Sequence, residues 1–212
     1  MKVLLVNGSP KERGCTYAAL SEAAAALEGE GIGTEIFHIG EGPMRGCIDC
    51  RRCSAGGGCA FKDDAVYAAL TKAKEFDGFI FGSPVYYAAA SGQMTSFMNR
   101  LFFGGSGAFA HKPGAAVVCC RRAGSTAALE QLNKYLVIAQ MILVGSQYWP
   151  MVHGNTPEEA RRDLEGMQTV RTLGRNMAWL LKSIKAGREA GIELPKPEPE
   201  RMRTNFIRAE VK

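Results

Sequence analysis

Apolar runs of strand length alternate along the chain with longer segments in which apolar residues recur every three or four positions. The short runs are rich in Val, Ile, Leu and Phe, which favours strands that are buried on both faces. They predict strands at 3–7, 35–39, 78–82, 115–120 and 142–146. The longer segments predict helices at 16–28, 63–75, 91–101, 125–139 and 157–187. Strands that alternate with helices are typical of βαβ units, so we expect an α/β fold with a five-stranded parallel sheet.

The composition indicates one globular domain. A chain of 212 residues with 46% hydrophobic and 22% charged residues can bury a sizeable core, which excludes a disordered chain. Its apolar runs fall short of the roughly 20 residues of a membrane-spanning helix, and the N-terminal run is too short for a signal peptide. We therefore expect a cytoplasmic protein with reduced cysteines and no membrane partner. We assign residues 1–188 to one domain with a cysteine loop at 40–62, and residues 189–212 to an extended C-terminal arm.

The formal net charge is +5, and acidic residues are interspersed with the basic ones. A nucleic-acid-binding protein usually concentrates Lys and Arg in one stripe. The pattern therefore argues against nucleic acid and suits an anionic small ligand.

The C-terminal arm carries three prolines between positions 195 and 199 in a charged setting. We favour a disordered terminus. The alternative is an arm that lies across a partner subunit through Met202, Phe206 and Ile207.

A polar, glycine-containing loop follows the first predicted strand and leads directly into a helix. It reads Gly8-Ser9-Pro10-Lys11-Glu12-Arg13-Gly14-Cys15-Thr16. In open parallel sheets, ligands bind outside the carboxyl ends of the strands, and backbone N–H groups at a helix start bind phosphate. The loop has neither the Walker nor the dinucleotide glycine spacing. It is either a phosphate site or an ordinary turn that Thr16 caps.

Two further loops follow the third and fourth predicted strands and are expected at the same edge of the sheet. The first, Ser83-Pro84-Val85-Tyr86-Tyr87, offers an aromatic wall suited to a flat heteroaromatic ring, unless one tyrosine packs on the core. The second, Arg121-Arg122-Ala123-Gly124-Ser125, offers cations and another helix start. By contrast, Gly105–Ala110 fits a dinucleotide pattern formally but follows a helix, so we interpret it as a flexible connection.

These loops, together with Gln131-Leu132-Asn133-Lys134-Tyr135, carry a family resemblance. In this order they resemble the flavodoxin-fold NAD(P)H-dependent FMN reductase family, and the resemblance implies a flavodoxin-like doubly wound sheet with helices on both faces. It implies an FMN phosphate site formed by Ser9, Arg13, Cys15 and Thr16. It further implies a ring site formed by Pro84, Val85, Tyr86 and Tyr87, with Arg122, Gly124 and Ser125 opposite. Relatives commonly carry Asn or Ser at the position of Cys15, so that residue is expected to contribute only its backbone.

A long loop between the second strand and the next helix holds four cysteines with the spacing Cys47-x2-Cys50-x2-Cys53-x5-Cys59. The first three match the spacing of a [4Fe-4S] site in bacterial ferredoxins, and the glycines at 56–58 would let the chain bring Cys59 back to it. The loop resembles that of the iron-sulfur flavoproteins, a branch of the same family. Free or redox-active thiols and structural zinc remain alternatives. Cys119 and Cys120 lie on a predicted strand and are expected to be inert core residues.

The resemblance implies an oxidoreductase in which NAD(P)H reduces FMN and the flavin passes electrons to a small-molecule or protein acceptor. Because the cofactor carries the chemistry, we predict no catalytic acid or base, and we expect a structural role for His153. The segment 147–154 is expected to line the ring pocket or cover the substrate. The resemblance also implies a homodimer or homotetramer. Two alternatives are an iron-sulfur flavoprotein that takes electrons from ferredoxin, and a non-enzymatic zinc or thiol-switch binding module.

Overall fold

The computed structural model describes residues 1–196, 198–200, 202 and 204. The strands are β1 (Lys2–Asn7), β2 (Gly33–His38), β3 (Gly78–Tyr86), β4 (Ala89–Ala90), β5 (Pro113–Cys120), β6 (Ile142–Leu143) and β7 (Met151–His153). The α-helices are α1 (Cys15–Gly29), α2 (Ala65–Lys72), α3 (Gly92–Gly105), α4 (Ser125–Ile138), α5 (Pro157–Arg162) and α6 (Leu164–Glu189). Short 3-10 helices follow α2 at Ala73–Glu75 and α3 at Ser106–Ala108, so part of the expected flexible connection at 105–110 is helical.

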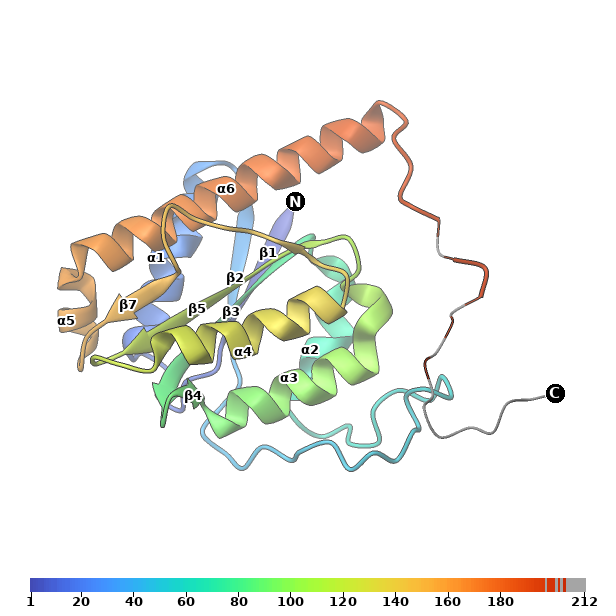
Figure 1. Cartoon of the computed structure of the whole chain (residues 1–212), viewed down its shortest axis with the longest axis horizontal. Coiled ribbons are helices and arrows are strands. Elements are labelled where there is room, and N and C mark those ends of the chain that lie inside the picture. Colours follow the sequence, from blue (N-terminus) through green and yellow to red (C-terminus); the bar gives the residue numbers. More distant parts are fainter. Residues whose placement is uncertain (197, 201, 203, 205–212) are drawn as a thin grey trace.

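The main sheet is parallel, with the order β2-β1-β3-β5 and then β6 and β7 beside β5. Helices α1, α5 and α6 cover one face, and α2, α3 and α4 cover the other (Figure 1). The order reverses direction after β1, because β2 lies on one side of β1 and β3 on the other. The structure confirms the predicted doubly wound sheet, and in such sheets ligands bind beside the carboxyl ends of the strands where the order reverses, here β1 and β3.

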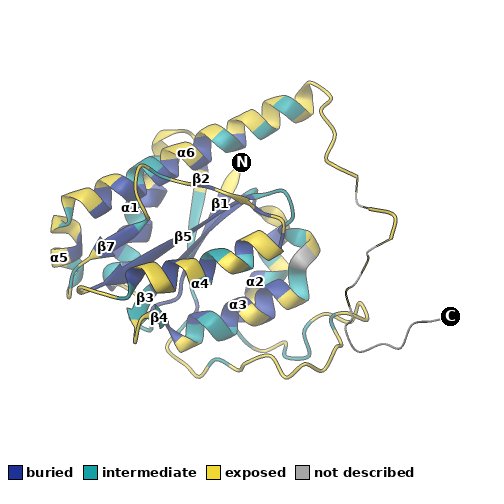
Figure 2. Cartoon of the chain, viewed as in Figure 1, coloured by how far each residue is buried: buried dark blue, intermediate teal, exposed yellow. Residues whose placement is uncertain are grey.

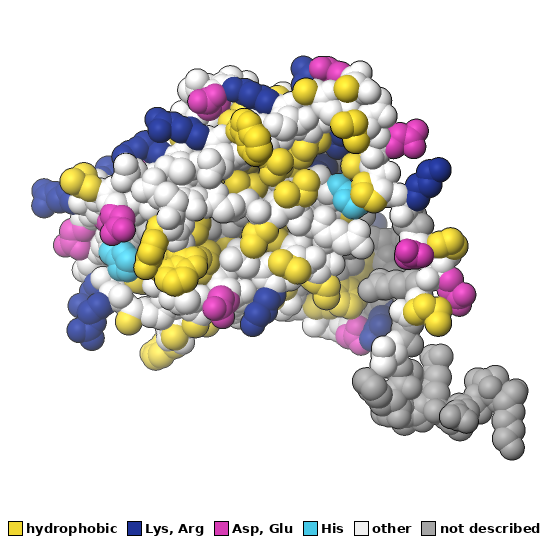
Figure 3. Space-filling model, turned by 45° about the horizontal axis from the view of Figure 1, so that its top comes forward, with side chains coloured by type: hydrophobic (Ala, Val, Ile, Leu, Met, Phe, Trp, Pro, Cys, Tyr) yellow, Lys and Arg dark blue, Asp and Glu magenta, His cyan; other side chains and the backbone are white. Residues whose placement is uncertain are grey.

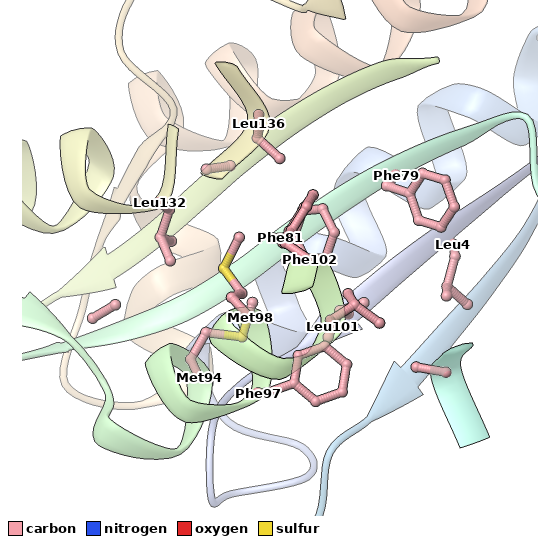
Figure 4. Packing of buried hydrophobic residues seen from close by; sticks show 14 of the residues in the cluster. Leu4, Phe79, Phe81, Met94, Phe97, Met98, Leu101, Phe102, Leu132 and Leu136 are labelled. Carbon is pink, nitrogen blue, oxygen red and sulfur yellow. The ribbon is translucent and has the colours of Figure 1, made fainter. Parts of the chain in front are cut away.

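Two layers of apolar residues, one on each face of the sheet, hold the helices in place. The buried residues lie on the sheet and on the helix faces that are turned toward it (Figure 2). Between the sheet and α3 and α4, phenylalanine rings pack in tilted and edge-on pairs. Phe79 lies 4.9 Å from Phe109, and Phe102 lies 4.8 Å from Phe109, between ring centroids. Figure 4 shows Met94, Phe97, Met98 and Leu101 of α3 packed in this layer. The rigid sheet edge that results fixes the loops described below.

The predicted fifth strand at 142–146 is shorter than expected, and a second segment completes its place. β6 pairs with β5 only at Pro113 and Gly114, and the chain then leaves the sheet. β7 resumes the pairing at Val118, whose N–H donates to Pro150 O at 3.0 Å. Two short strands therefore fill one edge position.

The prediction of a single helix at 157–187 is wrong, because the helix is interrupted at Asp163. The Asp163 backbone is not helical (φ −72°, ψ 84°), and its carboxylate accepts the Gly166 N–H at 2.9 Å and the His153 N–H at 2.7 Å. These bonds end α5 and start α6. The second helix ends at Glu189, and the residues described beyond it form no further helix or strand.

The described part of the C-terminal arm leaves the end of α6 and runs down the side of the molecule away from α5 (Figure 1). Met202 lies among the described residues and is exposed, whereas Phe206 and Ile207 lie outside them. No helix in the described part of the chain is long and apolar enough to cross a membrane.

Candidate active site

Three loops meet where β1, β3 and β5 end, and backbone contacts hold them together. The Gly8 N–H donates to Gly82 O at 2.8 Å, and the Ser91 hydroxyl donates to Gly8 O at 2.8 Å. A Cβ on Gly8 would lie 2.5 Å from Met94 Sδ, so only glycine fits this approach between the first loop and α3. The predicted convergence of the loops is confirmed.

The start of α1 is prepared for an anion. Its cap residue is Gly14, no side chain in the described structure caps it, and no acidic residue lies in its first turn. By contrast, Asp64, Thr156 and Asp163 cap α2, α5 and α6 through side-chain oxygens. Free N–H groups at a helix N-terminus attract negative charge.

Thr16 lies in this first turn with its hydroxyl buried. Within the described part of the chain, Thr16 Oγ1 has no oxygen or nitrogen partner, and the Cys119 thiol beside it is a weak hydrogen-bonding group. A buried hydroxyl without a partner is costly unless a ligand or water satisfies it. Thr16 therefore does not act as the helix cap, which favours the phosphate interpretation of the loop.

The other predicted phosphate residues differ in accessibility. Ser9 is buried, and its hydroxyl accepts the Lys11 N–H at 3.1 Å. Cys15 is half-buried, its Sγ lies 3.6 Å from Gly154 O, and burial raises the pKa of its thiol. Arg13 is exposed and donates to the Tyr17 hydroxyl at 2.7 Å, so it lies along α1 rather than over the loop.

Two residues that the sequence analysis missed shape this loop. The buried Asn7 accepts the Ser9 N–H at 3.1 Å and donates to Glu12 O at 2.9 Å. His38 Nε2 lies 2.8 Å from Ser9 O. Both residues end strands at the sheet edge, and that position was the available signal.

The aromatic loop is a β-hairpin rather than an irregular connection. β3 continues through Pro84 and Val85 to Tyr86 and pairs with β4, so that Tyr87 and Ala88 form the turn. Both turn residues have positive φ (51° and 58°), a conformation that normally favours Gly or Asn. Tyr86 is 48% and Tyr87 is 105% exposed, so neither ring packs on the core. Both tyrosines are accessible to a ligand.

The third loop packs against this hairpin. Gly124 caps α4 with a φ of +83°, and no side chain in the described structure caps that helix. Arg122 is exposed, and Ser125 is buried with its hydroxyl at the Cys120 thiol. Gln131 Oε1 accepts the Ala90 N–H at 3.0 Å and links α4 to the hairpin. A second uncapped helix start therefore faces the crevice.

The segment 147–154 is divided by β7. Tyr148 and Trp149 precede the strand, pack together at 5.0 Å between ring centroids, and line a separate cavity of about 520 Å³ with Leu129 and Leu143. These two aromatic residues lie before the start of β7, away from the three loops, so the expectation that the segment lines the ring pocket or covers the substrate stays a prediction. His153 pairs with the capping residue Asp163 (Nδ1–Oδ2 3.3 Å), as expected of a structural histidine.

The family described as NADPH-dependent FMN reductase matches residues 1–156, a range that includes all three loops. The chain belongs to the NADPH-dependent FMN reductase family. It is therefore a flavin-dependent oxidoreductase.

Three relatives that match this chain are named as iron-sulfur flavoproteins. An iron-sulfur flavoprotein of Methanocaldococcus jannaschii is 35% identical over 196 residues, which cover 87% of this chain and 100% of the relative. A second from the same organism is 30% identical and covers 82% and 94%. Another, from Methanosarcina thermophila, is 25% identical and covers 89% and 100%.

Solved structures agree on the fold of this FMN reductase family member. RosB with a bound riboflavin-5'-phosphate derivative aligns over all of this chain and 94% of its own, with a TM-score of 0.67 at 16% identity. A flavodoxin from the domain Archaea aligns over 86% and 99% with a TM-score of 0.56 at 17% identity. The fold is flavodoxin-like, as predicted.

The residues of the three loops have the chemical groups that FMN binding requires. The unpartnered Thr16 hydroxyl and the uncapped α1 offer donors to a phosphate, and the two exposed tyrosines offer ring faces. Cys119 and Cys120 are buried, as predicted for core residues, and burial raises the pKa of both thiols, which favours the unreactive protonated form.

The four cysteines of the cysteine loop line one pocket. Cys47, Cys50, Cys53 and Cys59 all line it, and all carry free thiols. Asp49 and Arg51 have positive φ (49° and 59°), so the chain turns sharply on both sides of Cys50. Gly56 and Gly58 (φ +82° and +65°) turn it back, as predicted. In the described residues, no three Cys, His, Asp or Glu side chains are gathered closely enough to hold a metal ion.

Arginines surround this pocket, and the sequence analysis missed the most buried one. Arg100 of α3 is buried, lines the pocket and donates to Cys59 Sγ at 3.3 Å. The exposed Arg51 pairs with Asp49 at 2.7 Å beside Cys47 and Cys53. Four soft sulfur ligands next to cations fit a negatively charged iron-sulfur cluster.

Proposed function

We propose that this flavin oxidoreductase is an iron-sulfur flavoprotein that carries electrons between FMN at the carboxyl edge of the sheet and a [4Fe-4S] cluster in the cysteine loop. The observation that carries the proposal is that all four loop cysteines line one pocket beside Arg100, although their thiols would have to draw closer to hold a cluster. The 35% identity to an iron-sulfur flavoprotein over that relative's full length supports it. Structural zinc sites usually use two separated pairs of cysteines, whereas these four cysteines line one pocket. This arrangement favours an iron-sulfur cluster over zinc.

The chain's own residues bind and orient the flavin. Ser9, Thr16 and the N–H groups at the start of α1 would hold the phosphate, with Arg13 and Cys15 at the rim. Pro84, Val85, Tyr86 and Tyr87 would contact the ring, with Arg122, Gly124 and Ser125 opposite. When bound, FMN supplies two-electron chemistry toward NAD(P)H and one-electron chemistry toward a cluster. No side chain is required to move a proton, and we assign no catalytic residue.

The first test is anaerobic purification followed by an absorbance spectrum and the quantification of iron, sulfide and zinc in one sample. We expect flavin bands and about four irons per chain. Cys53→Ser should lower the iron content, whereas Cys120→Ser, which removes a strand thiol, should leave it unchanged. Flavin with zinc or without metal would overturn the cluster. A colourless protein that neither binds FMN nor quenches its fluorescence would support a non-enzymatic zinc or thiol-switch module.

The electron donor is a separate question. We propose direct reduction by NAD(P)H, because the family description names NADPH, and transfer onward to a small-molecule or protein acceptor. Rapid anaerobic mixing with NADPH should bleach the flavin. Bleaching only with reduced ferredoxin would replace NAD(P)H with that protein as the donor.

We also propose that the chain forms a homodimer or homotetramer in the cytoplasm. An exposed apolar face supports the oligomer, and Figure 3 shows hydrophobic side chains spread across one side of the chain. It includes Val137 and Ile138 at the end of α4, Ile142 and Leu143 of β6, and Tyr148 and Trp149. Light scattering should give two or four chains, and Ile138→Lys should shift the mass toward one chain. A monomeric parent protein would overturn the proposal.

A further inference from the structure

Arg100 of α3 is unusual because it is a buried charged residue. Its side chain is 1% exposed, although α3 packs mainly apolar residues against the sheet. The cysteine loop runs along the outer side of this helix (Figure 1), and Arg100 lies on the pocket that the four cysteines line. A buried cation needs a specific reason to be there.

The guanidinium group has five N–H donors, and the described residues account for four of them. Nη1 donates to Asp64 Oδ2 at 2.5 Å and to Arg45 O at 3.2 Å. Nη2 donates to Asp64 Oδ1 at 3.1 Å and to Cys59 Sγ at 3.3 Å. Nε is buried and has no partner in the described part of the chain. Asp64 and Phe61, whose ring centroid lies 4.9 Å from the guanidinium carbon, hold the group in place.

Two independent observations therefore aim Arg100 at a ligand of this pocket. One is the hydrogen bond to Cys59 Sγ. The other is the orphaned Nε donor, because a buried donor without an acceptor lowers stability unless a ligand satisfies it. An anionic, sulfur-rich group would satisfy both donors at once.

We propose that Arg100 raises the reduction potential of the cluster through its positive charge and the hydrogen bond from Nη2 to the Cys59 sulfur, with the unpartnered Nε left to donate to the bound group. This rests on the proposed iron-sulfur function. Reduction adds one electron to the cluster, breaks no bond, and leaves the guanidinium protonated. Hydrogen bonds and positive charge stabilise the more negative, reduced state more than the oxidised state. Arg100 is thus a positioning residue that sets the direction of electron flow between flavin and cluster.

The neighbouring residues provide matched controls. Arg51 also carries a cation near Cys47 and Cys53, but its side chain is 70% exposed and solvent screens its charge. Asp64 places a negative charge against Arg100, and Asn at position 64 would keep the helix cap while removing that charge.

The test is an anaerobic redox titration of the holoprotein, with the reduced cluster followed by EPR and the flavin by absorbance. Arg100→Gln should lower the ratio of reduced to oxidised cluster about tenfold at a fixed potential. This corresponds to a decrease of about 59 mV in the one-electron reduction potential of the cluster. Arg51→Gln should shift it less, and Asp64→Asn should shift it in the opposite direction. The flavin potential should not move. Arg100→Lys keeps the charge but loses the planar fork, so it should give a smaller negative shift.

A purely structural role for Arg100 would lower iron content or stability and leave the potential of the remaining cluster unchanged, which would overturn the inference. Equal shifts in Arg51→Gln and Arg100→Gln would overturn the hydrogen bonds as the cause. If Arg100→Gln does not fold, Arg100→Lys and Asp64→Asn still decide the sign. Iron-free wild-type protein would instead overturn the proposed function, so the two failures are distinguishable.

Discussion

Gly124 and Ala88 touch where the third loop meets the hairpin: a Cβ on Gly124 would lie 2.6 Å from the Ala88 Cα and 2.9 Å from its Cβ. Gly124 also has a φ of +83°, and Ala88 has a φ of 58°. Two left-handed residues in contact therefore lock the hairpin tip to the start of α4. The positions of Tyr86 and Tyr87 over the crevice depend on this contact.

Gly124→Ala should destabilise the protein by about 2 kcal/mol, because the new methyl group meets backbone and the φ is unfavourable for alanine. FMN affinity should fall as well, since the hairpin must move. Urea unfolding and fluorescence titration of FMN measure the two effects. Gly107→Ala is the control, because its Cβ would meet nothing within 4 Å. Equal stability of the two variants would show that the Gly124 contact is not tight.

Thr16→Val should separate binding from stability. The valine keeps the shape and removes the buried hydroxyl that lacks a partner, so the FMN-free protein should be equally stable or more stable. FMN binding should weaken by about 1 to 3 kcal/mol, the cost of a lost hydrogen bond to a charged group. Riboflavin, which lacks the phosphate, is the control ligand and should bind both proteins equally. A loss of riboflavin affinity of the same size would move Thr16 away from the phosphate.

The strand and helix pattern could be predicted because each element has a clear hydrophobic period. Two features could not be predicted. Pro84 normally argues against a central strand, and a Tyr87-Ala88 turn lacks the expected glycine, so the β3–β4 hairpin gave no signal. The break at Asp163 depends on a hydrogen bond to the N–H of His153, ten residues away.

The loops of the site could be located because the carboxyl ends of parallel strands meet at one edge. Asn7 and Arg100 were missed for a different reason. Asn7 is buried and bonds to Ser9 and Glu12 within its own loop, so its role depends on how that loop folds. Arg100 depends on burial and on Cys59, 41 positions away in the sequence. A single Arg in an amphipathic helix is usually on the solvated face, so only the tertiary structure distinguishes this one.

The ion pair of Asp64 and Arg100 predicts a pH dependence. Burial by itself would raise the pKa of the Asp64 carboxyl, but the hydrogen bonds from Arg100 and from the Tyr67 N–H lower it below its ordinary range. The carboxylate therefore stabilises the folded state above the ordinary Asp pKa, and this contribution is lost as the pH falls through the lowered pKa. At pH 7, Asp64→Asn should cost about 3 kcal/mol, because it leaves a buried guanidinium without its counter-charge.

Unfolding of metal-free wild-type and Asp64→Asn proteins from pH 7 to pH 3 measures this. The difference in the free energy of unfolding should be constant at neutral pH and shrink below about pH 4. Asp63→Asn is the matched control, since the Asp63 side chain is 73% exposed. A difference that does not change with pH would mean that the charge of Asp64 does not account for the loss.

Asp163 tests whether His153 has a structural or a chemical role. Asp163→Ala removes the acceptor of the Gly166 and His153 N–H groups and should cost about 1 to 3 kcal/mol in unfolding experiments. Asp163→Asn keeps an oxygen acceptor and should recover most of that loss. His153→Ala leaves both backbone donors in place, so stability should change by less than about 0.5 kcal/mol. Because the flavin needs no protein acid or base, His153→Ala should also leave the rate of flavin bleaching by NADPH unchanged across pH 6 to 8. A pH-dependent loss of rate in this variant would assign His153 a chemical role.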